Sequence, residues 1–280
     1  MQDDRTADLE RVASRIVGSV ASGRAASPDE TRFLLREYVA TGREDVRDAL
    51  GVALAQALAA ARRDAAIVQR AALLTLFAEA APVADDERVL IAAGDLVTAL
   101  RGEWPSDLAR VGLAAATASV EACLRASGLL DPSQIVPQAI DELERIVAVA
   151  YRPGEGLSVP TQGARNSQKG APAFQASDHV AAASALLTAF EITGRLPYSM
   201  LAEELMQRHA DDCETARVLC RLAALHGNPD YRAAAVVAPG ADYRADAARI
   251  LADRGAQALA AQTDDAARYG IALRELMSLR

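Results

Sequence analysis

The sequence predicts an all-α fold of repeated antiparallel helical hairpins, which stack into an open arc or close into a ring. Alanine accounts for 64 of the 280 residues, whereas only 4% of the residues are aromatic. Alanine is the strongest helix former, and its small side chain lets neighbouring helices approach closely. Apolar residues also recur at helical spacing along almost the whole chain, and no segment alternates apolar and polar residues as a strand would. Several helix-and-turn segments resemble one another.

The clearest helix start is the segment Ser-Pro-Asp-Glu at residues 27–30. Ser27 suits the N-cap, Pro28 suits the first helical position, and the two acids face the positive end of the helix dipole. This helix is predicted to end at Gly42. Similar starts occur at residues 104–107, 131–133 and 196–198. Together these signals predict about twelve helices of ordinary length.

The best internal repeat pairs residues 34–43, Leu-Leu-Arg-Glu-Tyr-Val-Ala-Thr-Gly-Arg, with residues 186–195, Leu-Leu-Thr-Ala-Phe-Glu-Ile-Thr-Gly-Arg. Weaker copies occur at residues 219–227, 120–128 and 73–77. Each copy ends in a residue suited to a left-handed helix cap and leads into a second helix. One hairpin cannot bury its apolar stripe alone, so neighbouring hairpins must stack, and six hairpins would account for the predicted helices.

We expect one domain over residues 1–280, interrupted by a long irregular loop at 151–178. This segment contains four Gly and three Pro and has no helical period. A loop of this length inside a compact domain is uncommon, and a functional loop and a linker are both open interpretations.

The distribution of charged residues indicates which kinds of binding partner to expect. The net charge is −8, with 30 basic and 38 acidic residues and no basic stripe, so we expect no nucleic-acid partner. The arginines alternate with acids, which predicts solvated faces with local ion pairs: Arg11, Arg15, Arg43, Arg47, Arg62 and Arg63. The longest uncharged stretch, residues 49–61, is far shorter than the roughly 20 residues that span a bilayer, so no membrane partner is expected.

The cysteines and the N-terminus predict a cytoplasmic protein. Cys123, Cys213 and Cys220 are odd in number and widely spread, which is typical of buried, reduced thiols. The acidic N-terminal segment is unlike a secretory signal.

Residues 178–198 carry a family resemblance. They read Asp-His-Val-Ala-Ala-Ala-Ser-Ala-Leu-Leu-Thr-Ala-Phe-Glu-Ile-Thr-Gly-Arg-Leu-Pro-Tyr, followed by an Ala-Glu pair at 202–203. This pattern resembles a repeat of the (α/α) six-hairpin toroid enzymes, and most closely the helical region of thioredoxin-fused proteins related to N-acylglucosamine 2-epimerases. Residues 221–232 are similar to the next repeat, and residues 151–157 correspond to a Gly-rich loop near the mouth of that ring. The resemblance covers residues 140–260 and implies a central cavity for a small polar ligand.

Two departures separate the chain from that family. We expect no thioredoxin-like domain before the helices, and the sequence has only three histidines where the epimerases use several in the ring. Epimerase activity is therefore not implied.

The candidate site is the 151–178 loop with the helix start after it. Carboxylates and imidazoles are the usual proton carriers, so the predicted catalytic residues are Asp178, His179 and Glu155. The predicted ligand-binding residues offer guanidinium groups or aromatic rings to a sugar: Tyr151, Arg152, Arg165 and Phe174. The alternative interpretations are an N-cap role for Asp178 and a solvated position for His179.

The remaining motifs in the sequence predict neither a metal site nor a cofactor site. His209, Asp212 and Cys213 have a spacing that could offer zinc ligands, but a fourth ligand is missing. The acidic runs at residues 85–87, 211–212 and 264–265 lie near predicted helix starts, where acids offset the dipole. No phosphate-binding glycine loop and no nucleophile elbow occurs in the sequence.

Two functions stay open from the sequence. The first is a cytoplasmic toroid protein whose central cavity binds or processes a small polar ligand such as a carbohydrate. The second is a non-enzymatic helical-repeat scaffold that binds a protein partner on its concave face. An enzyme would bring several ionisable groups with shifted pKa values together in the cavity, whereas a scaffold would present a broad groove of Ala, Leu and Arg.

Overall fold

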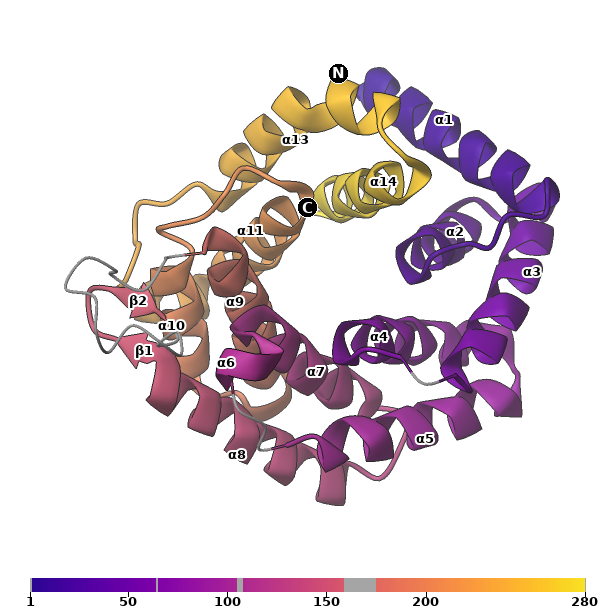
Figure 1. Ribbon diagram of the computed structural model, residues 1–280. Coiled ribbons are helices and arrows are strands. Elements are labelled where there is room, and N and C mark those ends of the chain that lie inside the picture. Colours follow the sequence, from indigo (N-terminus) through magenta and orange to yellow (C-terminus); the bar gives the residue numbers. More distant parts are fainter. Residues whose placement is uncertain (1, 64, 105–107, 159–174, 280) are drawn as a thin grey trace, which may run out of the picture.

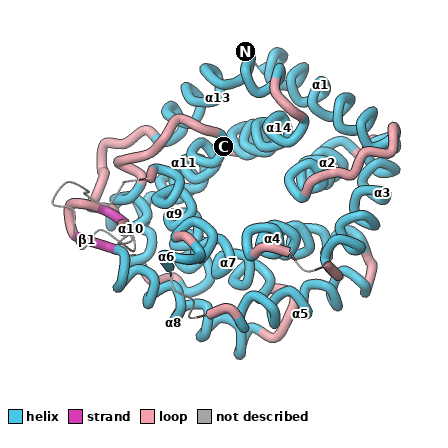
Figure 2. Tube along the Cα trace, viewed as in Figure 1, coloured by secondary structure: helices cyan, strands magenta, loops and turns pink. Residues whose placement is uncertain are grey.

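The computed structural model describes residues 2–63, 65–104, 108–158 and 175–279. In this part of the chain, helices form two concentric rings (Figures 1 and 2). The outer ring holds α1 (Gln2–Ala21), α3 (Glu44–Ala61), α5 (Glu87–Gly102), α8 (Pro132–Ala150), α10 (Leu196–Leu205) and α13 (Tyr243–Ala260). The inner ring holds α2 (Pro28–Thr41), α4 (Ile67–Ala84), α7 (Leu113–Ala126), α9 (Ala176–Thr193), α11 (Cys213–His226) and α14 (Thr263–Ser278).

The chain alternates between the two rings, so each hairpin joins an outer helix to an inner helix. Each inner helix contacts the next one around the ring, and α14 contacts α2, which closes the circle. The prediction of repeated helical hairpins is confirmed, and the structure selects the closed ring over the open arc. Two short helices, α6 (Leu108–Val111) and α12 (Pro229–Ala234), bring the described helices to fourteen, against the twelve expected.

The predicted helix signals are confirmed at the two strongest repeats. Ser27 accepts a hydrogen bond from the Glu30 amide at 3.1 Å, and the Glu30 carboxylate accepts one from the Ser27 amide at 2.8 Å. This reciprocal pair begins α2, which ends at Gly42 with φ of 66°. The matching α9 ends at Gly194 with φ of 69°. The prediction of a left-handed cap is wrong at Gly227, where φ is −67°, and at Gly128, where α7 instead ends at Ser127 with φ of −62°.

The seam between α14 and α2 depends on a close helix approach. Phe33 of α2 is fully buried, and a methyl group on Gly270 of α14 would overlap its ring. Glycine therefore lets the last inner helix come close enough to the first for the ring to close. Arg15 of α1 adds a contact on the outer ring by donating hydrogen bonds to the carbonyls of Leu259 and Ala261 at the end of α13.

The segment predicted as an irregular loop is ordered at both described ends. β1 (Tyr151–Arg152) pairs antiparallel with β2 (Gly156–Leu157), and α9 begins at Ala176. The β1–β2 hairpin lies at the outer edge of the ring, next to α10 (Figure 1). Residues 159–174 lie outside the described part of the chain.

Among the described residues, α4 is the one helix long and apolar enough to cross a membrane, with a mean hydropathy of 1.3. In the structure α4 is an inner helix packed on α2, α5 and α7. Its side chains Leu74, Leu76 and Phe77 are fully buried. Packing in the ring buries a third of this helix, and the absence of a membrane partner stays a prediction.

Candidate binding site in the central cavity

The inner helices line an open cavity of about 550 Å³. The first two turns of each of them contribute to its wall, so their N-terminal ends lie at the same end of the ring. The apolar part of the wall consists mainly of small side chains: Ala71, Ala72, Ala114, Ala115, Ala118 and Ala181. The charged part carries four acids and four arginines: Asp29, Arg32, Glu121, Arg125, Asp212, Glu214, Arg217 and Arg268.

A chain of ion pairs links four inner helices around this cavity. Arg32 of α2 donates to Glu79 of α4 at 2.6 Å, and Arg36 of α2 also donates to Glu79 at 3.2 Å. Arg36 then contacts Glu275 of α14 at 2.6 Å, and Arg217 of α11 reaches the same Glu275 oxygen at 3.3 Å. Burial opposes ionisation of Glu79, but Arg32 and Arg36 outweigh it and hold the pKa of its carboxyl well below the usual range.

A second cluster centres on Glu121 of α7. Its Oε1 accepts hydrogen bonds from Arg125 at 2.7 Å, from the Ser184 hydroxyl at 2.8 Å and from the Thr188 hydroxyl at 3.1 Å. Burial raises the pKa of Glu121, but Arg125 and Arg221 outweigh burial and lower it to about 2. Glu121 is therefore an ionised acceptor in a fixed position at neutral pH.

The prediction that the arginine side chains lie on solvated faces is confirmed for some arginines and wrong for others. Arg11 and Arg47 are exposed, with 63% and 53% of their side-chain surface accessible. In contrast, the side chains of Arg32, Arg217 and Arg221 are only 7%, 13% and 17% exposed and lie inside the ring. The alternation of charges could not distinguish the two groups, because both groups have acidic neighbours.

Four of the eight charged residues of the cavity belong to three pairs of charged residues four positions apart on inner helices: Arg32 with Arg36, Glu121 with Arg125, and Arg217 with Arg221. Arg11 and Arg15 have the same spacing on the outer helix α1, so the spacing alone does not identify the cavity. Residues at this spacing share one helix face. Each of these helices also carries an apolar stripe that faces the outer ring, so a charged stripe opposite it points toward the lumen.

The predicted ligand-binding residues in the β1–β2 hairpin lie away from the cavity. The Tyr151 hydroxyl donates to the carboxylate of Glu204 on α10, with oxygen distances of 2.8 and 2.9 Å. Arg152 and Glu155 are exposed, and the carbonyl of Glu155 accepts a hydrogen bond from Arg208. None of these three hairpin residues lines the cavity. The other two predicted ligand-binding residues, Arg165 and Phe174, lie outside the described residues.

Asp178 and His179 lie in the first turn of α9 and contact different neighbours. Asp178 accepts a hydrogen bond from the Ala114 amide of α7 at 3.1 Å, and burial raises its pKa. The N-cap of α9 is Gln175, so the N-cap interpretation of Asp178 is wrong. The expectation that His179 is solvated is also wrong, because it is 1% exposed.

His179 instead holds the β1–β2 hairpin against α9. Its Nε2 accepts a hydrogen bond from the Leu157 amide at 2.9 Å, and burial lowers its pKa. Gly156 lies so close to the imidazole that a methyl group there would overlap it. The catalytic roles of Asp178, His179 and Glu155 stay predictions.

The acidic runs occupy the helix starts that the sequence indicated. Asp212 is the N-cap of α11 and accepts a hydrogen bond from the Thr215 amide at 2.8 Å, and Asp86 is the N-cap of α5. Asp264 and Asp265 lie in the first turn of α14. Within the described residues, no group of three or more His, Cys, Asp or Glu side chains is placed to hold a metal ion.

No known protein family and no curated protein sequence matches the chain. Two solved structures are similar to it over 90% of this chain and 88% of theirs, each with a TM-score of 0.61. One is the GH76A alpha-1,6-mannanase from Salegentibacter sp. HEL1_6, at 10% identity. The other, at 11% identity, is an inactive variant of that enzyme with two consecutive aspartates changed to alanine, in complex with alpha-1,6-mannotetrose.

The chain has the (α/α)6 toroid fold. At such low identity the likeness concerns the fold, and fold alone does not determine function. The toroid part of the predicted resemblance is confirmed. These structures are not epimerase-related proteins, so they lend no support to the narrower resemblance.

Proposed function

We propose that the chain binds a small polar ligand of the carbohydrate class in the central cavity. The observation that carries this proposal is the ionised Glu121–Arg125 pair in the wall of a cavity of about 550 Å³. This volume lies in the range of about 300–1,000 Å³ that is typical of small-molecule sites.

The side chains of the cavity match the chemistry of a sugar. Sugar hydroxyls both donate and accept hydrogen bonds, an ionised carboxylate accepts them, and a guanidinium donates them. Within the described residues, every bond to Glu121 goes to Oε1, which leaves Oε2 for a ligand hydroxyl. The alanine walls offer apolar contact to the C–H faces of a sugar ring. The ligand of the mannanase variant with the same fold is also a carbohydrate.

The charge states of Asp29 and Glu121 suit these two carboxyl groups to accepting hydrogen bonds from a ligand better than to general-acid catalysis. Most glycoside hydrolases use two carboxyl groups, one of which must be protonated to act as the general acid. Burial opposes ionisation of Asp29 in this cavity, but Arg32 and Arg268 outweigh it and lower its pKa. Arginines also lower the pKa of Glu121, Glu79 and Glu275. Of the carboxyl groups in the cavity wall, Asp29 and Glu121 are therefore poor proton donors at neutral pH.

Titration calorimetry with mannose and with alpha-1,6-mannotetraose tests the proposal. We expect saturable binding that weakens at least about tenfold in Glu121→Gln, because a neutral amide replaces the ionised acceptor. Ala118→Leu fills part of the cavity without replacing a member of an ion pair. It should weaken saccharide binding by a similar factor. Glu87→Gln changes an exposed glutamate outside the cavity and should bind as the unchanged protein does.

Absence of binding by both saccharides, or binding unaffected by Glu121→Gln and Ala118→Leu, would overturn the proposal. Release of reducing sugar from the tetrasaccharide would show hydrolysis instead of binding alone.

A further inference from the structure

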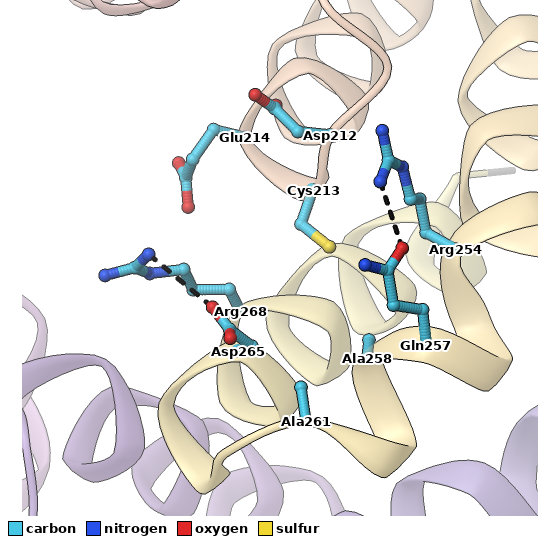
Figure 3. Close-up of a pocket in the computed structure, with 9 residues that line it drawn as sticks. All are labelled: Asp212, Cys213, Glu214, Arg254, Gln257, Ala258, Ala261, Asp265 and Arg268. Atoms are coloured by element: carbon cyan, nitrogen blue, oxygen red, sulfur yellow. Dashed lines mark hydrogen bonds and ion pairs between the residues drawn. The ribbon is translucent and has the colours of Figure 1, made fainter.

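A second cavity of about 300 Å³ lies beside the central one, between the first turns of α11 and α14 and the end of α13 (Figure 3). We call it the side lobe. The residues that line only the side lobe are Cys213, Arg254, Gln257, Ala258, Ala261 and Asp265. Three more residues line both cavities: Asp212, Glu214 and Arg268. The two spaces therefore adjoin along a shared boundary.

Long side chains form most of that boundary. Glu214 comes from α11 and accepts a hydrogen bond from Arg217 at 2.8 Å. Arg268 comes from α14 and contacts Asp29 and Asp264, each at 2.8 Å. Glu214 and Arg268 are 46% and 43% exposed, so solvent reaches both. The residues shared by the two cavities are thus polar and partly exposed to solvent, with no buried apolar side chain among them.

We infer that the central cavity and the side lobe form one cleft, which binds an oligosaccharide lying across Glu214 and Arg268. This inference rests on the proposed function and specifies the length of the ligand. The side lobe repeats the chemistry of the central cavity, with Arg254, Gln257 and Asp265 as polar groups (Figure 3). Its Ala258 and Ala261 give the apolar part of the wall. A single sugar ring occupies the central cavity and leaves the side lobe empty.

Cys213 provides a direct probe of the side lobe. Its side chain lines this cavity, whereas Cys123 and Cys220 are 0% and 2% exposed. Burial, with Glu214 and Asp212 nearby, raises the pKa of the Cys213 thiol to about 11. The thiolate is the reactive form, so labelling by a maleimide is slow near neutral pH and measurable near pH 9.

The test measures the rate of Cys213 labelling with each saccharide at saturation. We expect alpha-1,6-mannotetraose to slow labelling at least about fivefold, and mannose to change it less than about twofold. Cys213→Ser should abolish the signal, which identifies the labelled thiol. Equal protection by mannose and the tetrasaccharide would overturn the inference.

A steric variant provides an independent measurement. Gln257→Trp places a large side chain at an exposed position in the side lobe, so tetrasaccharide affinity should fall at least about fivefold while mannose affinity is unchanged. The matched control is Gln134→Trp, at an exposed position on α8.

The results separate the two proposals. If the tetrasaccharide binds without protecting Cys213 and without sensitivity to Gln257→Trp, this inference is wrong and the proposed function stands. If calorimetry shows binding of neither saccharide, both fail.

Discussion

Arg36 of α2 and Glu275 of α14 form an ion pair, with 2.6 Å between Nη1 and Oε1, that joins the first and last inner helices. Two further pairs follow the same seam: Arg274 with Glu37 at 2.6 Å and Arg268 with Asp29 at 2.8 Å. The paired residues are 237 to 239 positions apart in the sequence. Ion pairs therefore join the two ends of the chain where the ring closes.

Glu275→Ala should lower the free energy of unfolding by about 3 kcal/mol, because it leaves the largely buried guanidinium groups of Arg36 and Arg217 without this acceptor. Urea unfolding gives this quantity. Asp48→Ala removes the partner of Arg47 in an exposed pair and should cost less than about 1 kcal/mol. Equal losses in the two variants would show that the seam pair is no stronger than a surface pair.

Acidic pH should lower the free energy of unfolding of the protein, partly by protonating Glu121. The pKa of a glutamate carboxyl is ordinarily 4.5, and that of Glu121 in the folded protein is about 2. Between these values the unfolded chain binds more protons, so the stability that Glu121 contributes is present above pH 4.5 and declines as the pH falls toward 2. The contribution is on the order of 3 kcal/mol.

The measurement compares the unfolding free energies of the unchanged protein and Glu121→Gln at several pH values. The difference between them should be largest above pH 4.5 and should shrink as the pH falls. A difference that is constant from pH 7 to pH 3 would contradict the assigned pKa shift.

Gly270→Ala should destabilise the protein by about 1–3 kcal/mol, because the added methyl group overlaps the buried Phe33 ring. Thermal or urea unfolding measures the loss, and Phe33→Leu in the same chain should recover part of it. Gly94→Ala, in α5 with open space around the new methyl group, should instead stabilise by about 0.5–1 kcal/mol. If both alanine variants are stabilised, α14 and α2 are not in close contact.

Hydrogen exchange at the Leu157 amide should depend on the protonation of His179. This amide donates to Nε2, which accepts a hydrogen bond only when it carries no proton. Burial lowers the pKa of His179 below 6.5, so the neutral ring is stable at pH 7 and protonates as the pH falls below 6.5. Protection of Leu157, corrected for the intrinsic exchange rate, should decline over this range.

His179→Phe should remove this pH dependence, and the Gly42 amide, bonded to the Tyr38 carbonyl, serves as an internal reference. Equal protection of Leu157 at pH 7 in the unchanged protein and in His179→Phe would contradict the hydrogen bond to His179.

Local structure was the part of this protein that the sequence predicted and the structure confirmed. The Ser27 cap and the Gly42 and Gly194 ends were predictable, because each depends on residues within one or two helical turns. The sequence predicts a site in the 151–178 loop, because Gly and Pro interrupt the helical period there, and that site stays a prediction. The cavity at Glu121 and Arg125 could not be predicted, because it lies inside regular helices where no such interruption marks it.

Periodicity and capping signals act over short distances, so the helices, their hairpin order and the small side chains that let them pack follow from local sequence. Closure of the hairpins into a ring depends on the tertiary structure, because it requires Phe33 to meet Gly270 and Arg36 to meet Glu275. The tertiary structure also decided which arginines are exposed and which lie in the cavity. Arginine and its acidic partners form similar local patterns in both settings, and only packing determines whether water or the opposite helix surrounds them.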